Sequence, residues 1–339
     1  MMAEIENCTF DNETREGVTK MLESMSVLNR VDIFLGIFVS ILSSISTLAI
    51  MVDRNLRRKN AYLLTALLCI GYFIHGIGII IRAAMAIHQS YYYIDQPHTQ
   101  RYCFYQWICA VLGGEIIIDV SFMTAADRCI AVFNPLMYRK QSKWWWIGSQ
   151  LLIVSVHIIS ATVRHASSTS DKCIPLCVLL TAIELHVAVA MMIEFNLIVT
   201  ATLLIYIFLI VWAKLSIRKV ANQGGNAAAK RKQLKWKLIV TFALNVLVYT
   251  LTMFIGNTAI TTAGMIEDYE LAILLLKIGT VDHLSGLASL CVLFFRIREF
   301  RQAVLRLLRI REEAPTITTS SKIEQTVTST KTPTTNKQQ

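Results

Sequence analysis

Charged residues are scarce in this chain of 339 residues, where lysine, arginine, aspartate and glutamate together make up 17%. A soluble domain carries about 25%. Apolar residues reach 54%, which excludes intrinsic disorder for most of the chain. Five prolines and 14 glycines are too few for a collagen-like or low-complexity protein, and eight cysteines are too few for a small disulfide-stapled scaffold. The apolar surplus instead suffices for several membrane spans of about 20 residues each.

Seven apolar runs are long enough to cross a membrane as helices. They cover residues 31–52, 61–81, 103–132, 144–163, 185–213, 238–262 and 271–295. Barrel strands are excluded, because such strands need only about 10 residues with alternating polarity. The sequence therefore predicts an all-α membrane protein, a seven-transmembrane helix bundle over residues 31–295, with its two termini on opposite sides of the membrane.

The basic residues predict the orientation of the bundle. Lysine and arginine gather in the connections 53–60, 133–143 and 214–237 and in the segment 296–339, which hold 24 of them, whereas the opposite side holds seven. Because basic connections stay in the cytoplasm, we expect a multi-pass protein of the plasma membrane with residues 1–30 as an extracellular N-terminal tail and a cytoplasmic C-terminus. The same rule accounts for the net charge of +10, so no nucleic acid is expected as a partner.

Both ends of the chain carry signals that agree with this orientation. Asn7 and Asn12 each begin an Asn-x-Thr sequon, and these predict N-glycosylation on the outer side. Residues 296–311 place apolar side chains opposite arginines and predict a short amphipathic helix on the inner leaflet. Residues 312–339 hold nine threonines and three serines, which predicts a disordered cytoplasmic tail open to kinases.

The third apolar run ends in a charged pair, Asp127-Arg128, and the sequence Asn-Pro135-Leu-Met-Tyr138 follows shortly after it. A pair of charges at a helix end is costly within hydrocarbon and therefore belongs at the membrane interface. Two interpretations stay open. The arginine is a snorkelling side chain with a counter-ion, or the pair is a cytoplasmic latch whose arginine is released to contact a partner.

A cysteine marks the other end of the same run. Cys103 precedes Asp127 by 24 residues, about 36 Å of helix, so it lies at the outer mouth of the bundle. The next outer connection holds Cys173 and Cys177 in the oxidising compartment. We expect a disulfide between Cys103 and Cys173, with Cys177 as the alternative partner.

Ionisable side chains inside the predicted spans form the last group, each at a cost of at least about 2.5 kcal/mol on insertion scales. They are Glu115, Asp119, Glu194, Lys277 and Asp282, with His283 beside the last. They are either neutral or paired groups that hold helices together, or they line a polar ligand pocket. Such a pocket is expected to include Glu115, Asp282 and His283 and to be lined further by Trp107, Tyr249 and Asn257.

An outer cysteine followed after 24 residues by Asp-Arg-x-x-Ala-x-x-x-Pro-x-x-Tyr resembles the rhodopsin-like seven-transmembrane G-protein-coupled receptors. In detail the chain is similar to the nematode serpentine chemoreceptors of class SX over about residues 30–310. The residues that carry this likeness are Arg101-Tyr102-Cys103-Phe104, Leu251-Thr252-Met253, Ala288-Ser289 and the run from Phe294 to Arg301.

The resemblance implies a chemosensory receptor that responds to an unknown extracellular ligand, a small molecule or a peptide, and couples to a heterotrimeric G protein. Coupling would involve Asp127, Arg128, Pro135 and Tyr138, and His283 falls where such receptors place ligand contacts. Kinases and arrestin would act on the C-terminal tail. The basic connection 214–237 has two interpretations, attraction to the phosphates of membrane lipids or contact with the G protein.

The chain also departs from the pattern of these receptors. Cys129 stands where a tyrosine commonly follows the Asp-Arg pair, and Gly71 stands where many relatives carry a sodium-binding aspartate. The spans after residue 185 contain no proline, so proline kinks cannot supply hinges there. No acid occurs between Lys214 and Lys237 to restrain Arg128 in the resting state, which predicts measurable signalling without ligand.

Other classes of function find less support. The chain has no Gly-x-Ser-x-Gly, no Walker loop and no His-Glu-x-x-His, so we do not expect an enzyme or a cofactor. Cys173 and Cys177 have no pair of histidines nearby, so no metal site is expected either. A transporter or channel would also contain buried charge but predicts internal repeats and broken helices, which are not evident. A seven-helix subunit that does not couple, a decoy or a heteromer partner, is the remaining alternative.

Overall fold

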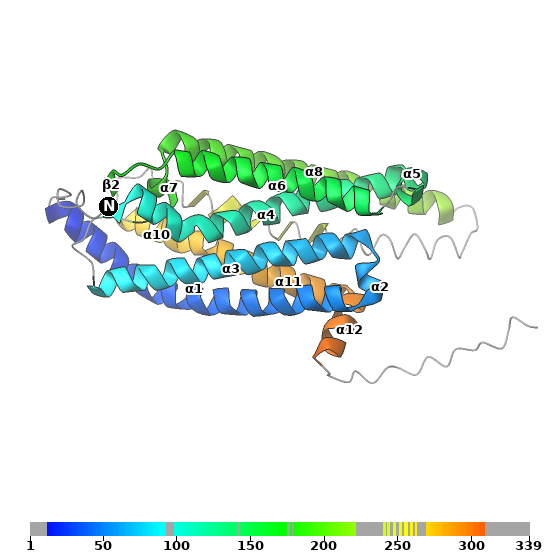
Figure 1. Cartoon of the computed structure of the whole chain (residues 1–339), viewed down its shortest axis with the longest axis horizontal. Helices are drawn as coiled ribbons and strands as arrows, with labels where there is room; N and C mark the ends of the chain where they lie inside the picture. Colours follow the sequence, from blue (N-terminus) through cyan, green and yellow to red (C-terminus); the bar gives the residue numbers. More distant parts are fainter. Residues whose placement is uncertain are drawn as a thin grey trace, which may run out of the picture.

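Long helices that run side by side along one axis dominate the computed structural model (Figure 1). It describes residues 12–92, 98–140, 143–174, 177, 179–221 and 269–308, with scattered positions between 240 and 262. Because a bilayer interior offers no water, a spanning segment must satisfy its backbone groups within itself. The long apolar runs therefore become helices.

Six helices in the described part are long and apolar enough to cross a membrane. They are α1 (Asn12–Val52), α3 (Asn60–Tyr92), α4 (Gln100–Phe133), α6 (Lys143–Ser167), α8 (Leu185–Ala221) and the run of α10 (Tyr269–Gly279), the 3₁₀ turn η2 (Thr280–His283) and α11 (Leu284–Arg296). The predicted run 238–262 lies largely outside the described residues, and its described positions are helical. The predicted all-α architecture is thus confirmed for six of the seven spans.

The first helix is longer than its apolar run. α1 has 41 residues, about 60 Å at the usual rise of a helix. Glu16 and Lys20 form an ion pair of 3.0 Å one turn apart, a contact that supports an exposed helix, and Met21 is buried. Residues 12–30, which the sequence assigned to an N-terminal tail, are therefore helical and extend the first span beyond its apolar run. The end of the bundle that they reach is called the outer end below and the opposite end the inner end, after the orientation that the sequence predicts.

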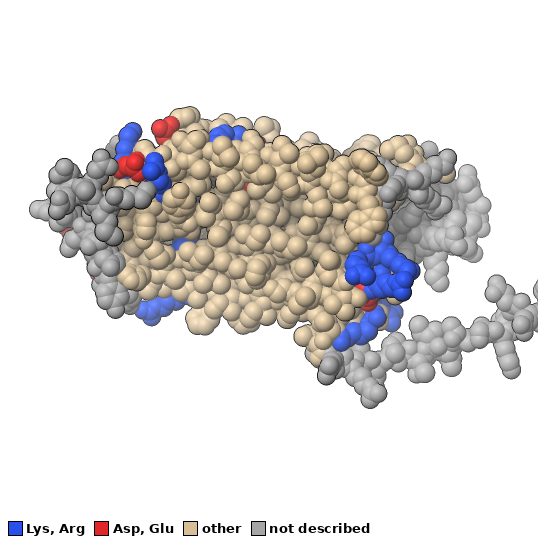
Figure 2. All heavy atoms as spheres, in the orientation of Figure 1, with Lys and Arg blue, Asp and Glu red and all other residues tan. Residues whose placement is uncertain are grey.

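On the face shown in Figure 2, the middle of the bundle carries few charged side chains, whereas lysine, arginine and the acids gather mainly near its two ends. On α6, for example, Leu152, Val156 and Ile159 are exposed. Soluble proteins seldom expose apolar patches of this extent. Lipid tails are the surroundings that such a surface requires, which supports a membrane location.

Glycines bring α3 and α4 unusually close together. A Cβ atom at Gly78 would lie 2.2 Å from the backbone nitrogen of Ala110, and one at Gly113 would lie 2.4 Å from the backbone nitrogen of His75. No larger residue fits at either position. Gly78 faces Ala110 and Gly113 faces His75, so the two contacts lie about one turn apart along each helix and set the register in which α3 and α4 face each other.

Short elements close the inner end of the bundle. These are α2 (Arg54–Arg57), α5 (Pro135–Lys140) and α12 (Arg298–Leu307). Phe300, Ala303 and Val304 of α12 are buried in a core cluster together with Ala49 and Ile50 of α1. A helix thus occurs within the predicted segment 296–311, and its apolar face packs against the bundle. Its place on the inner leaflet stays a prediction, and residues 312–339 lie outside the described part.

At the outer end, β1 (His98–Thr99) pairs antiparallel with β2 (Cys173–Ile174). The short helix α7 (Leu179–Ala182) follows and leads into α8. Cys103, Phe104, Ile174 and Ile183 share a core cluster beneath these strands. The outer connection is therefore packed onto the first turns of α4.

Candidate functional site

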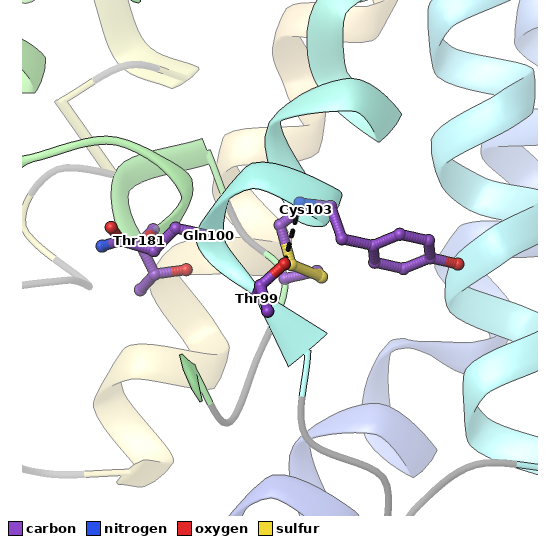
Figure 3. The surroundings of a disulfide bond; sticks show 6 residues. Thr99, Gln100, Cys103 and Thr181 are labelled. Atoms are coloured by element: carbon purple, nitrogen blue, oxygen red, sulfur yellow. Dashed lines mark hydrogen bonds between the residues drawn. A yellow bond between two sulfur atoms is a disulfide. The ribbon is translucent and has the colours of Figure 1, made fainter. Parts of the chain in front are cut away.

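A disulfide ties the outer end of α4 to the connection before α8 (Figure 3). Cys103 is bonded to Cys177, with Cα atoms 5.3 Å apart. The pairing of Cys103 with Cys173, named first from the sequence, is therefore wrong, and the alternative is the one present. Cys173 lies opposite Thr99 in the β1–β2 pair and is engaged in a different disulfide. Cys177, four residues further on, is the one that meets the first turn of α4.

Two hydrogen bonds that involve the Gln100 side chain support this disulfide. Its side-chain amide donates to the backbone carbonyl of Thr181 at 3.1 Å, a contact between α4 and α7. The hydroxyl of Ser170 donates to its Oε1 at 2.6 Å. The outer connection is thereby fixed to α4 on both sides of the disulfide, over the mouth of the bundle.

A buried ionic cluster, here called the Asp32 cluster, joins the first, second and last described spans. Asp32 of α1 is 1% exposed. It forms an ion pair with Arg82 of α3 and accepts a hydrogen bond of 2.9 Å from Nδ1 of His283 in η2. Since carboxylate oxygens only accept, Nδ1 of His283 carries the proton. His283, predicted as a pocket residue, therefore lies in a polar centre together with Asp32 and Arg82, which the sequence analysis did not include.

Two aromatic groups border the Asp32 cluster. The guanidinium carbon of Arg82 lies 5.2 Å from the centre of the Trp107 ring on α4, within range of a cation–π contact. The rings of His75 and His283 lie 6.5 Å apart, and Nδ1 of His75 contacts the carbonyl of Ala110 at 3.0 Å. Trp107, predicted as a pocket residue, is thus brought to the same region as His283.

A second centre, here called the His157 cluster, joins α4, α6 and α8. His157 contacts Oδ2 of Asp119 at 2.8 Å through Nδ1 and Oε1 of Glu194 at 2.7 Å through Nε2. Arg164 pairs with the other oxygen of Glu194. A histidine between two carboxylates is best satisfied as an imidazolium, since both nitrogens then donate. The acidic and basic side chains of this cluster are partly exposed, from 9% at Asp119 to 41% at Arg164.

The other predicted pocket residues are not gathered at one place. Glu115 is buried, 3.8 Å from Nε2 of His165 on α6, and so turns to a different partner from its neighbour Asp119. Lys277 is exposed. The backbone of Asp282 belongs to η2, but its side chain is outside the description, as are Tyr249 and Asn257 altogether.

The inner end of α4 holds the Asp127-Arg128 pair in a closed arrangement. The side chain of Asp127 is fully buried and accepts hydrogen bonds from the Tyr138 hydroxyl at 3.1 Å and from Nε1 of Trp146 at 2.9 Å. Arg128 contacts the same carboxylate at 3.1 Å. Burial, and after it the charge of Asp127, raise the pKa of Tyr138 to about 12, so this hydroxyl remains a donor at physiological pH. Pro135 begins α5, which carries Tyr138.

The sequence missed several partners for identifiable reasons. Asp32 and Arg82 lie at the edges of the predicted spans, where charge was used to mark the boundary. His157 and Trp146 lie within the fourth predicted run, but the tryptophan fits an interfacial aromatic belt equally well. An aspartate just inside the first predicted span and an arginine directly after the second, both at the outer end, were the signal that could have identified the Asp32 cluster.

These features together are typical of one class of protein, the serpentine receptors. The bundle is helical and apolar, its third span carries a disulfide at the outer end, and the inner end of that span holds a buried acid beside an arginine. Residues 21–308 match the family described as serpentine type 7TM GPCR chemoreceptor Srsx. The chain belongs to this family, which confirms the seven-transmembrane fold and the resemblance to class SX. No curated protein matches the chain.

Proposed function

We propose that this chain is a chemosensory G-protein-coupled receptor of the plasma membrane. It binds an extracellular ligand in the outer half of the bundle and activates a heterotrimeric G protein at the inner end. Membership of the Srsx family supports a receptor of this kind. The observation that carries the coupling step is the arrangement of Asp127, which has two neutral donors besides its neighbour Arg128.

That arrangement lowers the energetic cost of releasing Arg128 from the acid. A buried carboxylate with no donor costs several kcal/mol. Because Tyr138 and Trp146 donate to Asp127, the carboxylate stays satisfied when the arginine turns toward a partner. The pair is thus suited to two states, one with Arg128 held against Asp127 and one with Arg128 extended into the cytoplasmic face of the bundle.

The surface around this pair favours a negatively charged partner or membrane. Arg54, Arg57 and Arg58 are exposed at the inner end of the bundle, and basic side chains gather at this end in Figure 2. Such charge attracts anionic lipid headgroups and acidic protein surfaces. This orientation places the C-terminus in the cytoplasm and the disulfide of Cys103 outside.

Nucleotide exchange tests the coupling step. The purified receptor in nanodiscs is mixed with purified heterotrimers of the three main G-protein classes, and binding of labelled GTPγS is measured without ligand. We expect exchange above empty nanodiscs for at least one class. Arg128→Ala should lower it about tenfold or more, the usual effect of truncating an arginine anchor at an interface, whereas the matched outer variant Arg101→Ala should not.

Two further results would change the proposal. If an epitope after Gln339 is labelled on intact cells, the orientation is reversed and the inner latch cannot meet a G protein. If no G-protein class responds, either without ligand or during a ligand screen, the chain is a receptor subunit that does not couple.

A further inference from the structure

Beside the Asp32 cluster, three buried hydrogen-bond donors have no acceptor in the described part of the chain. They are Nε of Arg82, Nε1 of Trp107 and Nε2 of Gln106. The first two atoms can only donate, so reassigning an amide or a histidine does not remove the mismatch. Gln106 is 7% exposed. Polar groups this deeply buried are nearly always paired in native proteins, so these three donors together are suited to bind a further group.

The three donors belong to one region. The guanidinium carbon of Arg82 lies 5.2 Å from the centre of the Trp107 ring, and Gln106 precedes Ala110 by about one turn as Arg82 follows Gly78 by one, so Gln106 lies level with Arg82. The contact of Gly78 with Ala110 holds α3 and α4 together one turn below. Trp107 follows the disulfide-bonded Cys103 by four residues, about 6 Å along the helix. The donors therefore lie just beneath the outer mouth, where a molecule from outside arrives first.

The neighbouring charges are already engaged. Asp32 contacts Arg82 through one terminal nitrogen of the guanidinium and His283 through Nδ1, and it has no unpartnered buried oxygen. His75 contacts a backbone carbonyl through Nδ1. Since a carbonyl oxygen only accepts, His75 donates there. The groups that face the region thus offer donors on Arg82 and Trp107, and no carboxylate of the described residues remains to accept from them.

We propose that this region binds a small carboxylate, held by Arg82, Trp107 and Gln106. The inference rests on the proposed receptor function and names the chemical class of its ligand. A carboxylate presents two oxygens with about four acceptor positions, whereas a ketone or aldehyde presents one oxygen. Bonds from arginine to a carboxylate are also charge-assisted and among the strongest that a protein makes. A guanidinium Nε with two further donors, on Trp107 and Gln106, therefore favours a carboxylate over a neutral carbonyl compound.

A ligand series tests this chemistry without a G protein. The purified receptor in detergent is heated with straight-chain monocarboxylates of three to ten carbons, with their methyl esters and with the matching alcohols. We expect a saturable rise in the melting temperature for at least one acid and none for its ester or alcohol. Equal stabilisation by acid and ester, or no stabilisation by any acid at millimolar concentration, overturns the proposal.

Trp107→Phe separates a binding role from a structural one. It keeps the ring beside Arg82 but removes one unpartnered donor, so the receptor without ligand should melt no lower than the wild type. Its affinity for the stabilising acid should nevertheless fall about tenfold, as expected for one hydrogen bond to a charged group. Trp145→Phe is the matched control, because that tryptophan is 80% exposed at the inner end, and it should change neither value. Loss of stability without ligand and unchanged affinity would show that Trp107 only packs.

The outcomes for ligand and coupling are distinguishable. Stabilisation by acids together with absent nucleotide exchange leaves the carboxylate site standing and removes the coupling proposal. Exchange that depends on Arg128 but no stabilisation by any acid does the reverse. The readouts are independent, since melting is measured on the receptor alone.

Discussion

The Asp32 cluster and the His157 cluster are both chains of ionisable groups inside the bundle, yet they differ in completeness. In the His157 cluster, no side chain of Asp119, His157, Arg164 or Glu194 holds a buried atom without a hydrogen bond. In the Asp32 cluster the acid is satisfied, but Nε of Arg82 is not. A cluster that satisfies itself suffices to hold helices together, whereas one with donors left over is suited to receive a further molecule.

Removal of the charge of Asp32 should have the largest effect. Asp32→Asn leaves Arg82 buried without a counter-ion and His283 without its carboxylate acceptor, and breaking a buried ion pair costs about 3–5 kcal/mol. We expect poor surface delivery and a strongly lowered melting temperature in detergent. The double variant Asp32→Asn/Arg82→Gln should be more stable than the single one, because no unpaired charge remains. If both melt alike, the cluster is not held by its charges.

Asp127 sharpens the comparison, since it is as buried as Asp32 but is held by neutral donors as well. Trp146→Phe removes the hydrogen bond from Nε1 while the bond from Tyr138 remains. The loss should be about 1.5–3 kcal/mol, the range for a hydrogen bond to a charged group, seen as a lower melting temperature. Trp144→Phe, an exposed neighbour, serves as the control and should melt like the wild type. An equal loss in both variants would point to the aromatic belt instead.

His157→Gln should have a smaller effect on stability than either variant above. Glutamine keeps one donor, Glu194 keeps Arg164, and His157 is 27% exposed. We expect a loss of about 1 kcal/mol, a typical net value for one hydrogen bond, with no change in affinity for carboxylates. A loss as large as that of Asp32→Asn would show that partial exposure does not weaken this cluster and would remove the distinction between the two.

The contrast also shows how far the sequence alone leads. Apolar length predicts the helices, because bilayer thickness determines the length of a span, and the Asp127-Arg128 motif predicts the inner pair. Partners on other helices are not encoded by spacing. Nothing in the local sequence directs His157 to Glu194. Cys173 and Cys177 lie only four residues apart, and nothing in the sequence shows which of them pairs with Cys103. The role of Asp32 was not predicted, because charge was used to mark the end of a span. A buried charge is nevertheless tolerated inside a span once a partner neutralises it.

Glu299 lies at the far end of this series of carboxylates and should have the smallest effect. It accepts a hydrogen bond from Nζ of Lys59 at 2.6 Å and one from the Tyr62 hydroxyl at 3.0 Å, linking α12 to the first inner connection. Its side chain is 55% exposed, so Glu299→Gln should cost less than about 1 kcal/mol. The variant Asp171→Asn at the outer end, which removes the exposed contact with Arg101, is the matched control.

The pH dependence gives the sharper test of this last contact. The hydrogen bond from Lys59, the largest cause, lowers the pKa of Glu299 below its ordinary value of 4.5. A lowered pKa stabilises the folded receptor above the ordinary value, and the gain is lost as the pH falls through the lowered pKa. The melting temperatures of wild type and Glu299→Gln should therefore differ at neutral pH and converge as the pH falls through the lowered pKa of Glu299. A gap that persists in acid would show that Glu299 acts through packing and not through its charge.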